Sequence, residues 1–141
     1  MMPEPPQSLL QLTHRPDLSI LVGRWAYQPV QPELPAVYQH VETVALAENC
    51  RFWLQDIRRR TLNDPQTTAW LLNDFFPGMA RRLGGRLFVA YLVGPTLQEA
   101  ILQQPGYISA EAYDGKPFAI SFFGDEGEAI RWLQMQQSGL Y

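Results

Sequence analysis

The chain has 141 residues, of which 46% are hydrophobic and 18% are charged, and its formal net charge is -3 at pH 7. These values are typical of one globular domain large enough to bury a core, and they exclude a disordered chain. The net negative charge argues against a protein that binds nucleic acid through a broad basic face.

Cysteine content and hydropathy narrow the class of protein further. Cys50 is the only cysteine, which excludes an intramolecular disulfide and a cysteine-based zinc cluster. The sequence has no run of about 18 apolar residues, so it predicts no transmembrane segment. Residues 1–14 lack the basic and apolar regions of a secretory signal. We therefore expect a cytoplasmic protein.

The first half of the chain predicts an arm followed by alternating elements. Residues 1–16 are rich in Pro and Gln and predict a flexible N-terminal arm, which leaves residues 17–141 as a single domain. Hydrophobic periodicity and β-branched content then predict three elements: a strand over 18–27, a helix over 33–49 and a strand over 51–57. The second strand is a nearly continuous apolar run, as expected of a strand covered on both faces.

The second half of the chain continues this alternation. A helix is expected to begin at Pro65, with Asn63 or Asp64 as its cap. Pro77 lies inside the same pattern and is expected to kink or break the helix. The remaining elements follow in order: a strand over 86–94, a short helix capped by Thr96 and Glu99, two strands around the turn Asp114–Gly115, and a helix that begins at Asp125. This order predicts one α/β domain, a sheet with helices packed on it.

A search for catalytic and metal-binding motifs gives no candidate. Gly84 and Gly85 follow a helix, whereas a phosphate-binding loop needs its glycines between a strand and a helix. His14 and His40 are the only histidines, and neither lies in the pattern of a catalytic triad or a metal site. We therefore name no catalytic residue, no metal ligand and no cofactor.

The stretch FWLQDIRRRTLNDP contains the strongest candidate for a binding site. Asp56 ends a predicted strand, and ligands of an open α/β sheet gather at the carboxyl ends of its strands. Arg58, Arg59 and Arg60 follow, and a guanidinium binds carboxylate or phosphate through two parallel hydrogen bonds. Together with Thr61 they predict a surface for an anion or an acidic partner. In the alternative interpretation the arginines are solvated and pair with nearby acids.

Two tryptophans predict a second kind of site. Trp53 and Trp70 lie on either side of the arginine stretch in the sequence and could line a pocket. Packing in the core is the commoner fate of aromatic side chains on strands and helix faces. The sequence leaves both interpretations open.

Several segments together carry a resemblance to a known family. They are a strand ending in Asp56, a helix with Trp70 and the sequence FFP, the strand RLFVAYLVGP, and the closing F…DEGEAIRWL. In this combination the chain resembles the bacterial SpoIIAA-like proteins of the STAS superfamily, over residues 18–135. The resemblance implies a mixed sheet of four or five strands with helices mainly on one side. Anti-sigma-factor antagonists of this superfamily carry a phosphorylatable Ser or Thr two residues after the strand-end Asp. This chain has Arg58 there, and Thr61 is the nearest hydroxyl.

These features together predict a non-enzymatic regulatory or protein-binding module of STAS-like type, with an unidentified protein partner. The alternative is a small-molecule or lipid-binding protein with an aromatic-lined pocket. A pocket of several hundred Å³ lined by the tryptophans would favour this alternative. A filled core and an exposed apolar patch would favour a protein partner. The sequence leaves open whether the chain forms homo-oligomers.

Overall fold

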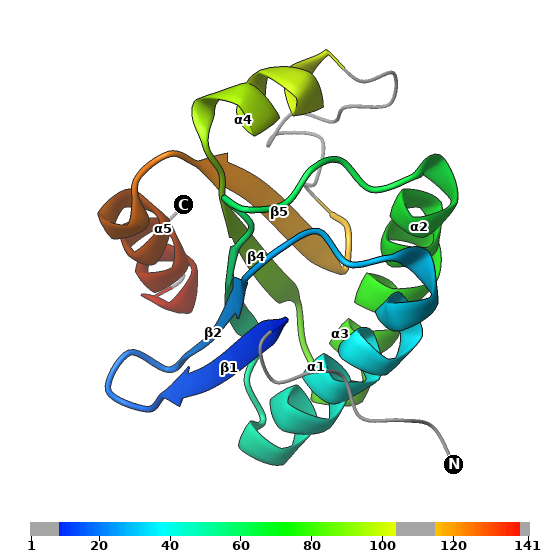
Figure 1. The fold of residues 1–141 in the computed structure, drawn as a ribbon. Coiled ribbons are helices and arrows are strands. Elements are labelled where there is room, and N and C mark those ends of the chain that lie inside the picture. The colour runs from blue at the N-terminus through cyan, green and yellow to red at the C-terminus, as the bar shows by residue number, and fades with distance from the viewer. Residues whose placement is uncertain (1–8, 104–114, 139–141) are drawn as a thin grey trace.

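The computed structural model describes residues 9–103 and 115–138, which form one α/β domain around a five-stranded sheet (Figure 1). The strands lie in the sheet in chain order: β1 (Leu10–Arg15), β2 (Ile20–Trp25), β3 (Phe52–Asp56), β4 (Leu87–Leu92) and β5 (Phe118–Phe123). β1 pairs with β2 in antiparallel orientation, and all other neighbours are parallel, so the sheet is mixed.

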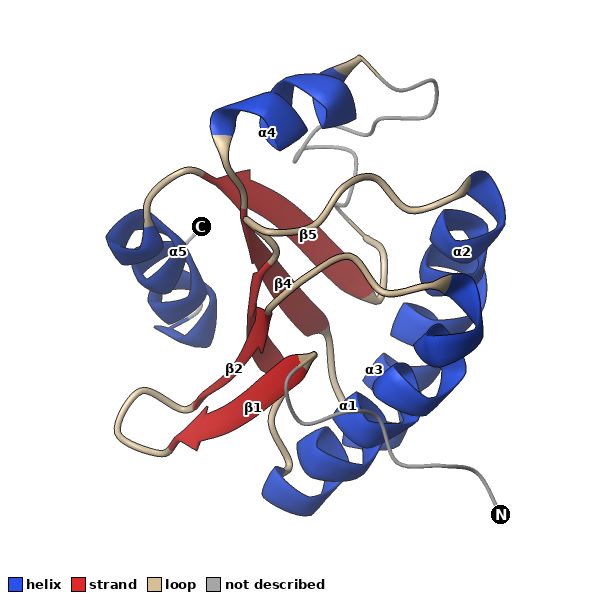
Figure 2. Cartoon of the chain, viewed as in Figure 1, coloured by secondary structure: helices blue, strands red, loops and turns tan. Residues whose placement is uncertain are grey.

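Helices cover both faces of this sheet. α1 (Leu34–Glu48) and the helical stretch over residues 65–83 lie on one face, and α5 (Glu126–Ser138) lies on the other (Figure 2). α4 (Pro95–Leu102) lies beyond the carboxyl ends of the parallel strands. The central strands are therefore covered on both faces, as their apolar sequences predict. No helix within the described residues is long and apolar enough to cross a membrane.

The expected flexible arm over residues 1–16 is wrong for residues 10–15, which form β1. Every residue of β1 pairs with one of β2, from Leu10 opposite Trp25 to Arg15 opposite Ile20. Leu10, Leu12 and His14 alternate with more exposed residues, which is the period of a half-buried edge strand. The sequence LQLTHR shows this alternation. The prediction missed it because it rested on the composition of residues 1–16 as a whole, which is rich in Pro and Gln.

Pro77 does not end the helix that contains it, so the expected break is wrong, whereas the expected kink stays a prediction. The chain stays helical through three successive segments: α2 (Pro65–Trp70), a π-helical turn (Leu71–Phe75) and α3 (Phe76–Leu83). In the π-helical turn the Phe76 N–H donates to the carbonyl of Leu71, five residues earlier. The wider turn gives room for a proline ring that would otherwise meet the carbonyl four residues before it. It also lets the consecutive residues Phe75 and Phe76 both reach the core.

The helix starts follow the sequence in two of three cases. Asp64 accepts a hydrogen bond from the Thr67 N–H at 3.1 Å, and Asp125 accepts one from the Glu128 N–H at 3.0 Å, so both predicted caps are confirmed. α4 instead begins one residue earlier than expected, with Gly94 as its cap and no side-chain bond. Of the two strands predicted around Asp114–Gly115, the second is β5, and the first lies outside the described residues.

The burial of β4 leads to a first prediction. Leu92 is only 1% exposed, so the Leu92→Ala substitution leaves a cavity and should lower the free energy of unfolding by about 2–5 kcal/mol. Leu102 in α4 is 53% exposed, and Leu102→Ala is the matched control, with an expected change of less than about 0.5 kcal/mol. Chemical denaturation of both variants measures the difference. Equal losses at the two positions would contradict a central position for β4.

Candidate functional site

The parallel register of β2 and β3 brings two opposite charges together at the carboxyl edge of the sheet. Arg24 and Asp56 are direct partners in this register. One nitrogen of Arg24, Nη1, donates to Asp56 Oδ2 at 3.0 Å and to Glu126 Oε1 at 2.9 Å. Since Glu126 lies in the first turn of α5, this guanidinium joins two strand ends to the start of the last helix.

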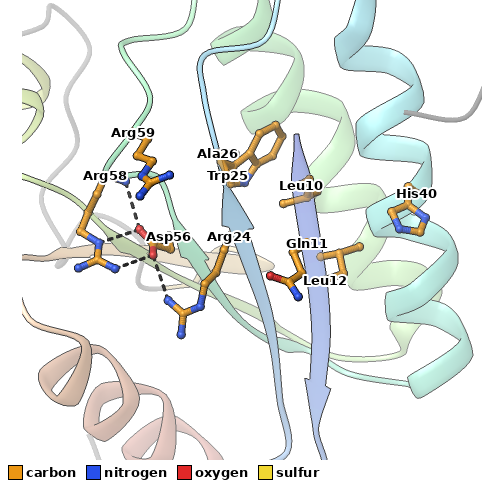
Figure 3. A pocket seen from close by; sticks show the side chains of 10 residues that line it. All are labelled: Leu10, Gln11, Leu12, Arg24, Trp25, Ala26, His40, Asp56, Arg58 and Arg59. Carbon is orange, nitrogen blue, oxygen red and sulfur yellow. Dashed lines mark hydrogen bonds and ion pairs between the residues drawn. The ribbon is translucent and has the colours of Figure 1, made fainter. Parts of the chain in front are cut away.

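The carboxylate of Asp56 is enclosed by donors (Figure 3). Arg58 binds it with two side-chain bonds, from Nε to Oδ1 at 2.9 Å and from Nη2 to Oδ2 at 2.8 Å, and with its backbone N–H at 3.2 Å. Burial by itself would raise the pKa of Asp56, but the hydrogen bonds from Arg58 and Arg24 outweigh it and lower the pKa below its ordinary value. Asp56 is therefore ionised at neutral pH and holds two guanidinium groups in place.

The structure separates the three consecutive arginines that the sequence grouped. Arg58 is paired with Asp56, and its side chain stays 53% exposed. Arg59 is exposed, and no carboxylate of the described residues forms an ion pair with it. Arg60 is only 6% exposed and belongs to the core side of the loop. Two of the three thus share a surface with Asp56, and the third has a different role.

Arg60 is held by an aromatic ring and by neutral oxygens. Its guanidinium carbon lies 4.3 Å from the centre of the Trp25 ring, a cation–π contact. Its Nε donates to Gln28 Oε1 at 3.4 Å, and its Nη2 donates to Asn63 Oδ1. The exposed Thr61 donates its backbone N–H to the same Gln28 oxygen at 2.9 Å. Arg60 therefore anchors the loop between β3 and α2.

An open hollow of about 940 Å³ lies beside these groups (Figure 3). Arg24, Asp56, Arg58 and Arg59 line it together with apolar side chains such as Leu10. Three arginines line the hollow, and two carboxylates, those of Asp56 and of the adjoining Glu126, form ion pairs with two of them. The net charge of these five side chains is therefore positive. The hollow is thus an open surface of polar and apolar groups, on which Arg59 offers a guanidinium that no carboxylate of the described residues pairs with.

Neither Trp53 nor Trp70 lines the two larger hollows found among the described residues. Trp53 is 1% exposed and donates its indole N–H to the Cys50 carbonyl at 2.8 Å. Trp70 is 40% exposed and packs its ring against Tyr38 and Phe75. The enclosed space beside Trp53 measures about 10 Å³, far less than the several hundred Å³ of a typical ligand site. Both side chains serve packing in the described part of the chain.

Sequence reasoning missed Arg24 and Glu126. Both lie far from the arginine stretch along the chain, and only the sheet order brings them to Asp56. A signal existed, because Arg24 and Asp56 each interrupt an apolar strand near its end. Opposite charges at the same position of two parallel neighbours are expected to pair, but the sequence does not show which strands are neighbours.

Comparison with known proteins gives no family for this chain. No model of a protein family matches it, and no similar protein is found among the curated ones. Within the described residues, no group of three or more His, Cys, Asp or Glu side chains could hold a metal ion. The geometry of the carboxyl edge is therefore the basis for a functional proposal.

The adjacent residues Arg59 and Arg60 give a matched pair of substitutions. Arg60→Gln removes a buried cation–π contact and the donor to Asn63, while Gln28 keeps the Thr61 N–H, so the substitution should cost about 1–3 kcal/mol of folding stability. Arg59→Gln changes an exposed side chain and should alter stability by less than about 0.5 kcal/mol. Urea titration of both variants compares them. A larger loss for Arg59→Gln would contradict this assignment.

The lowered pKa of Asp56 predicts a pH-dependent contribution to stability. A group whose pKa falls on folding stabilises the protein above its unfolded value, about 3.9 for Asp, and loses this effect as the pH falls through the folded value. Asp56→Asn should therefore cost about 1–3 kcal/mol at pH 7, and the gap to the wild type should close in acid. The exposed Asp17, paired with Arg15, provides the control Asp17→Asn, whose loss should be much smaller because solvent screens an exposed ion pair. A gap that stays constant from pH 7 to pH 3 would refute the prediction.

Proposed function

We propose that the chain is a non-enzymatic binding or regulatory module of STAS-like type that binds an acidic protein partner at the carboxyl edge of its sheet. One observation carries the proposal: the Asp56 carboxylate is engaged by Arg24 and Arg58. A carboxylate held in this way orients guanidinium groups and is a poor proton acceptor. The side chains of Arg24 and Arg58 remain 43% and 53% exposed, so they can meet a second carboxylate.

The STAS-like part of the proposal is supported by the architecture. A mixed five-stranded sheet agrees with the four or five strands that the resemblance implies. The strand-end acid and the loop before the next helix also have their counterparts, in Asp56 and residues 57–64. Arg58 stands where the antagonists of that superfamily carry a phosphorylatable hydroxyl, and it is tied to Asp56. We therefore propose recognition by charge, in the cytoplasm, without a phosphoryl switch at this position.

A protein partner fits this surface better than a small molecule does. The hollow is open to solvent, and its lining includes Trp25 and Ala26. The chain continues from there to Tyr27 and Val30, which are 40% and 62% exposed. Tyr and Arg are the side chains enriched where protein surfaces meet, since they combine apolar area with hydrogen bonds. The filled space around Trp53 gives no comparable support to a lipid or small-molecule pocket.

Charge reversal at Arg59 tests the proposal. Partners are first identified by co-purification from the native host with mass spectrometry, and binding of each purified partner is then titrated by calorimetry. Arg59→Glu should weaken binding at least tenfold and leave the melting temperature unchanged, because Arg59 is exposed and has no ion pair within the described residues. Arg131→Glu, at an exposed position of α5, is the control with the same change of charge and should bind as the wild type does.

Two outcomes would contradict the proposal. One is equal loss of affinity in both variants, which would indicate a general effect of net charge. The other is a partner whose cross-links lie away from Arg59 and the hollow beside it. A partner that binds through this edge should also show affinity that falls with salt, because the attraction between exposed charges is screened.

A further inference from the structure

The buried side-chain amide of Gln55, in β3, lines a small cavity. Gln55 is 5% exposed, and its Oε1 accepts a hydrogen bond from the Trp25 indole N–H at 2.8 Å. Because an indole N–H can only donate, this bond fixes which end of the amide is oxygen. The Nε2 group therefore points away from Trp25, and it is buried without a hydrogen-bond partner among the described residues.

The pairing of β2 with β3 determines where the Gln55 amide lies. Gly23 is the partner of Gln55 in the register of β2 and β3. A Cβ atom at Gly23 would lie 3.0 Å from both Nε2 and Oε1 of Gln55, closer than such contacts normally come. A side chain at Gly23 would therefore crowd the Gln55 amide, and glycine at this position gives the amide its room beside β2.

Arg60 brings a buried positive charge to the same place. Its hydrogen-bond partners, Gln28, Asn63 and the Tyr38 hydroxyl, are neutral, and no carboxylate of the described residues forms an ion pair with it. Buried charges in proteins are normally compensated by an opposite charge, because removing an ion from water is costly. Burial also raises the pKa of Tyr38, against the opposing effect of Arg60, so this phenol keeps its proton.

These groups enclose one cavity. It measures about 10 Å³, and its walls include Trp25, Tyr38, Trp53, Gln55, Arg60 and Tyr91. This is about the space of one water molecule or of an ion of similar size. The Gln55 amide and the Tyr38 hydroxyl can donate to an occupant, Arg60 supplies positive charge, and the described lining contains no carboxylate. Two donors beside a buried positive charge suit an anion, because the anion would also compensate the charge of Arg60.

We propose that this cavity binds a single monovalent anion of the halide class, such as chloride, which acts as the internal counter-ion of Arg60. The site is separate from the surface hollow, because Gln55 and Asp56 point to opposite faces of β3. It also does not depend on the proposed partner. Loss of partner binding in Arg59→Glu leaves this inference untouched, and an empty cavity leaves the proposed function untouched.

Crystallography with bromide tests the proposal directly. Crystals of the full chain grown in sodium bromide, with data collected above the bromine absorption edge, should give an anomalous peak between Gln55 Nε2, Tyr38 Oη and the Arg60 guanidinium. Density for a water molecule at this place, with no anomalous signal at high bromide concentration, would overturn the proposal.

A measurement in solution uses the Gln55→Glu variant. The melting temperature is followed as bromide replaces gluconate, an anion too large for the cavity, at constant ionic strength. The wild type should melt at higher temperature as bromide increases, because a ligand that binds only the folded state stabilises it. Gln55→Glu keeps an oxygen for Trp25 and places a fixed carboxylate beside Arg60, so its melting temperature should not respond to bromide.

Gln39→Glu is the matched control, since Gln39 is exposed on α1, and it should respond to bromide as the wild type does. The same response in Gln55→Glu and in the wild type would overturn the proposal, because the effect would then not arise at this cavity. If Gln55→Glu does not fold, the anomalous map of the wild type decides the question alone.

Discussion

The register between β2 and β3 determines where the polar groups of this protein lie. Its consecutive pairs, Gly23 with Gln55 and Arg24 with Asp56, face opposite sides of the sheet, because side chains alternate along a strand. A slip of one residue would carry the Asp56 carboxylate into the aromatic core and expose the Gln55 amide. One alignment of two strands thus separates a buried network of donors from a surface network of ion pairs.

Trp25, at the end of β2, joins the two buried polar side chains Gln55 and Arg60. Its indole N–H orients Gln55, and its ring face supports the guanidinium of Arg60 at 4.3 Å. Arg60 also closes the turn after β3, since its backbone N–H donates to the Ile57 carbonyl at 3.0 Å. With Arg60 anchored inside the loop, Arg58 and Arg59 are presented on its outer surface. The exposed part of the arginine stretch therefore depends on the buried part.

The sequence predicted the elements better than it predicted their polar contacts. Hydrophobic periodicity placed β2 to β4 and α1 correctly, and cap residues such as Asp64 placed helix starts. It failed for β1, where composition outweighed a short alternating pattern, and for a helix break at Pro77, where a π-helical turn precedes the proline and the chain stays helical. For the site, the prediction grouped Arg58, Arg59 and Arg60 because they are consecutive in the sequence. In the fold, Arg58 and Arg59 are exposed and Arg60 is buried. Only the strand order, which no local pattern encodes, brings Arg24 to Asp56.

The arginines at the carboxyl edge of the sheet have different roles: some are paired with Asp56 and one is not. This difference explains how an edge with little net charge can still attract an acidic partner. An exposed ion pair contributes little by itself, about 0–1 kcal/mol, partly because ordering two long side chains costs entropy. Here Asp56 has already ordered Arg24 and Arg58 before any partner arrives, so less of that entropy remains to be lost on binding. Arg59 supplies a charge that no carboxylate of the described residues pairs with, and the exposed Tyr27 and Val30 flank Gln28, which binds the arginine loop at Arg60 and Thr61. Affinity at this edge would thus arise from preorganised donors combined with apolar contact, with charge deciding which partners are accepted.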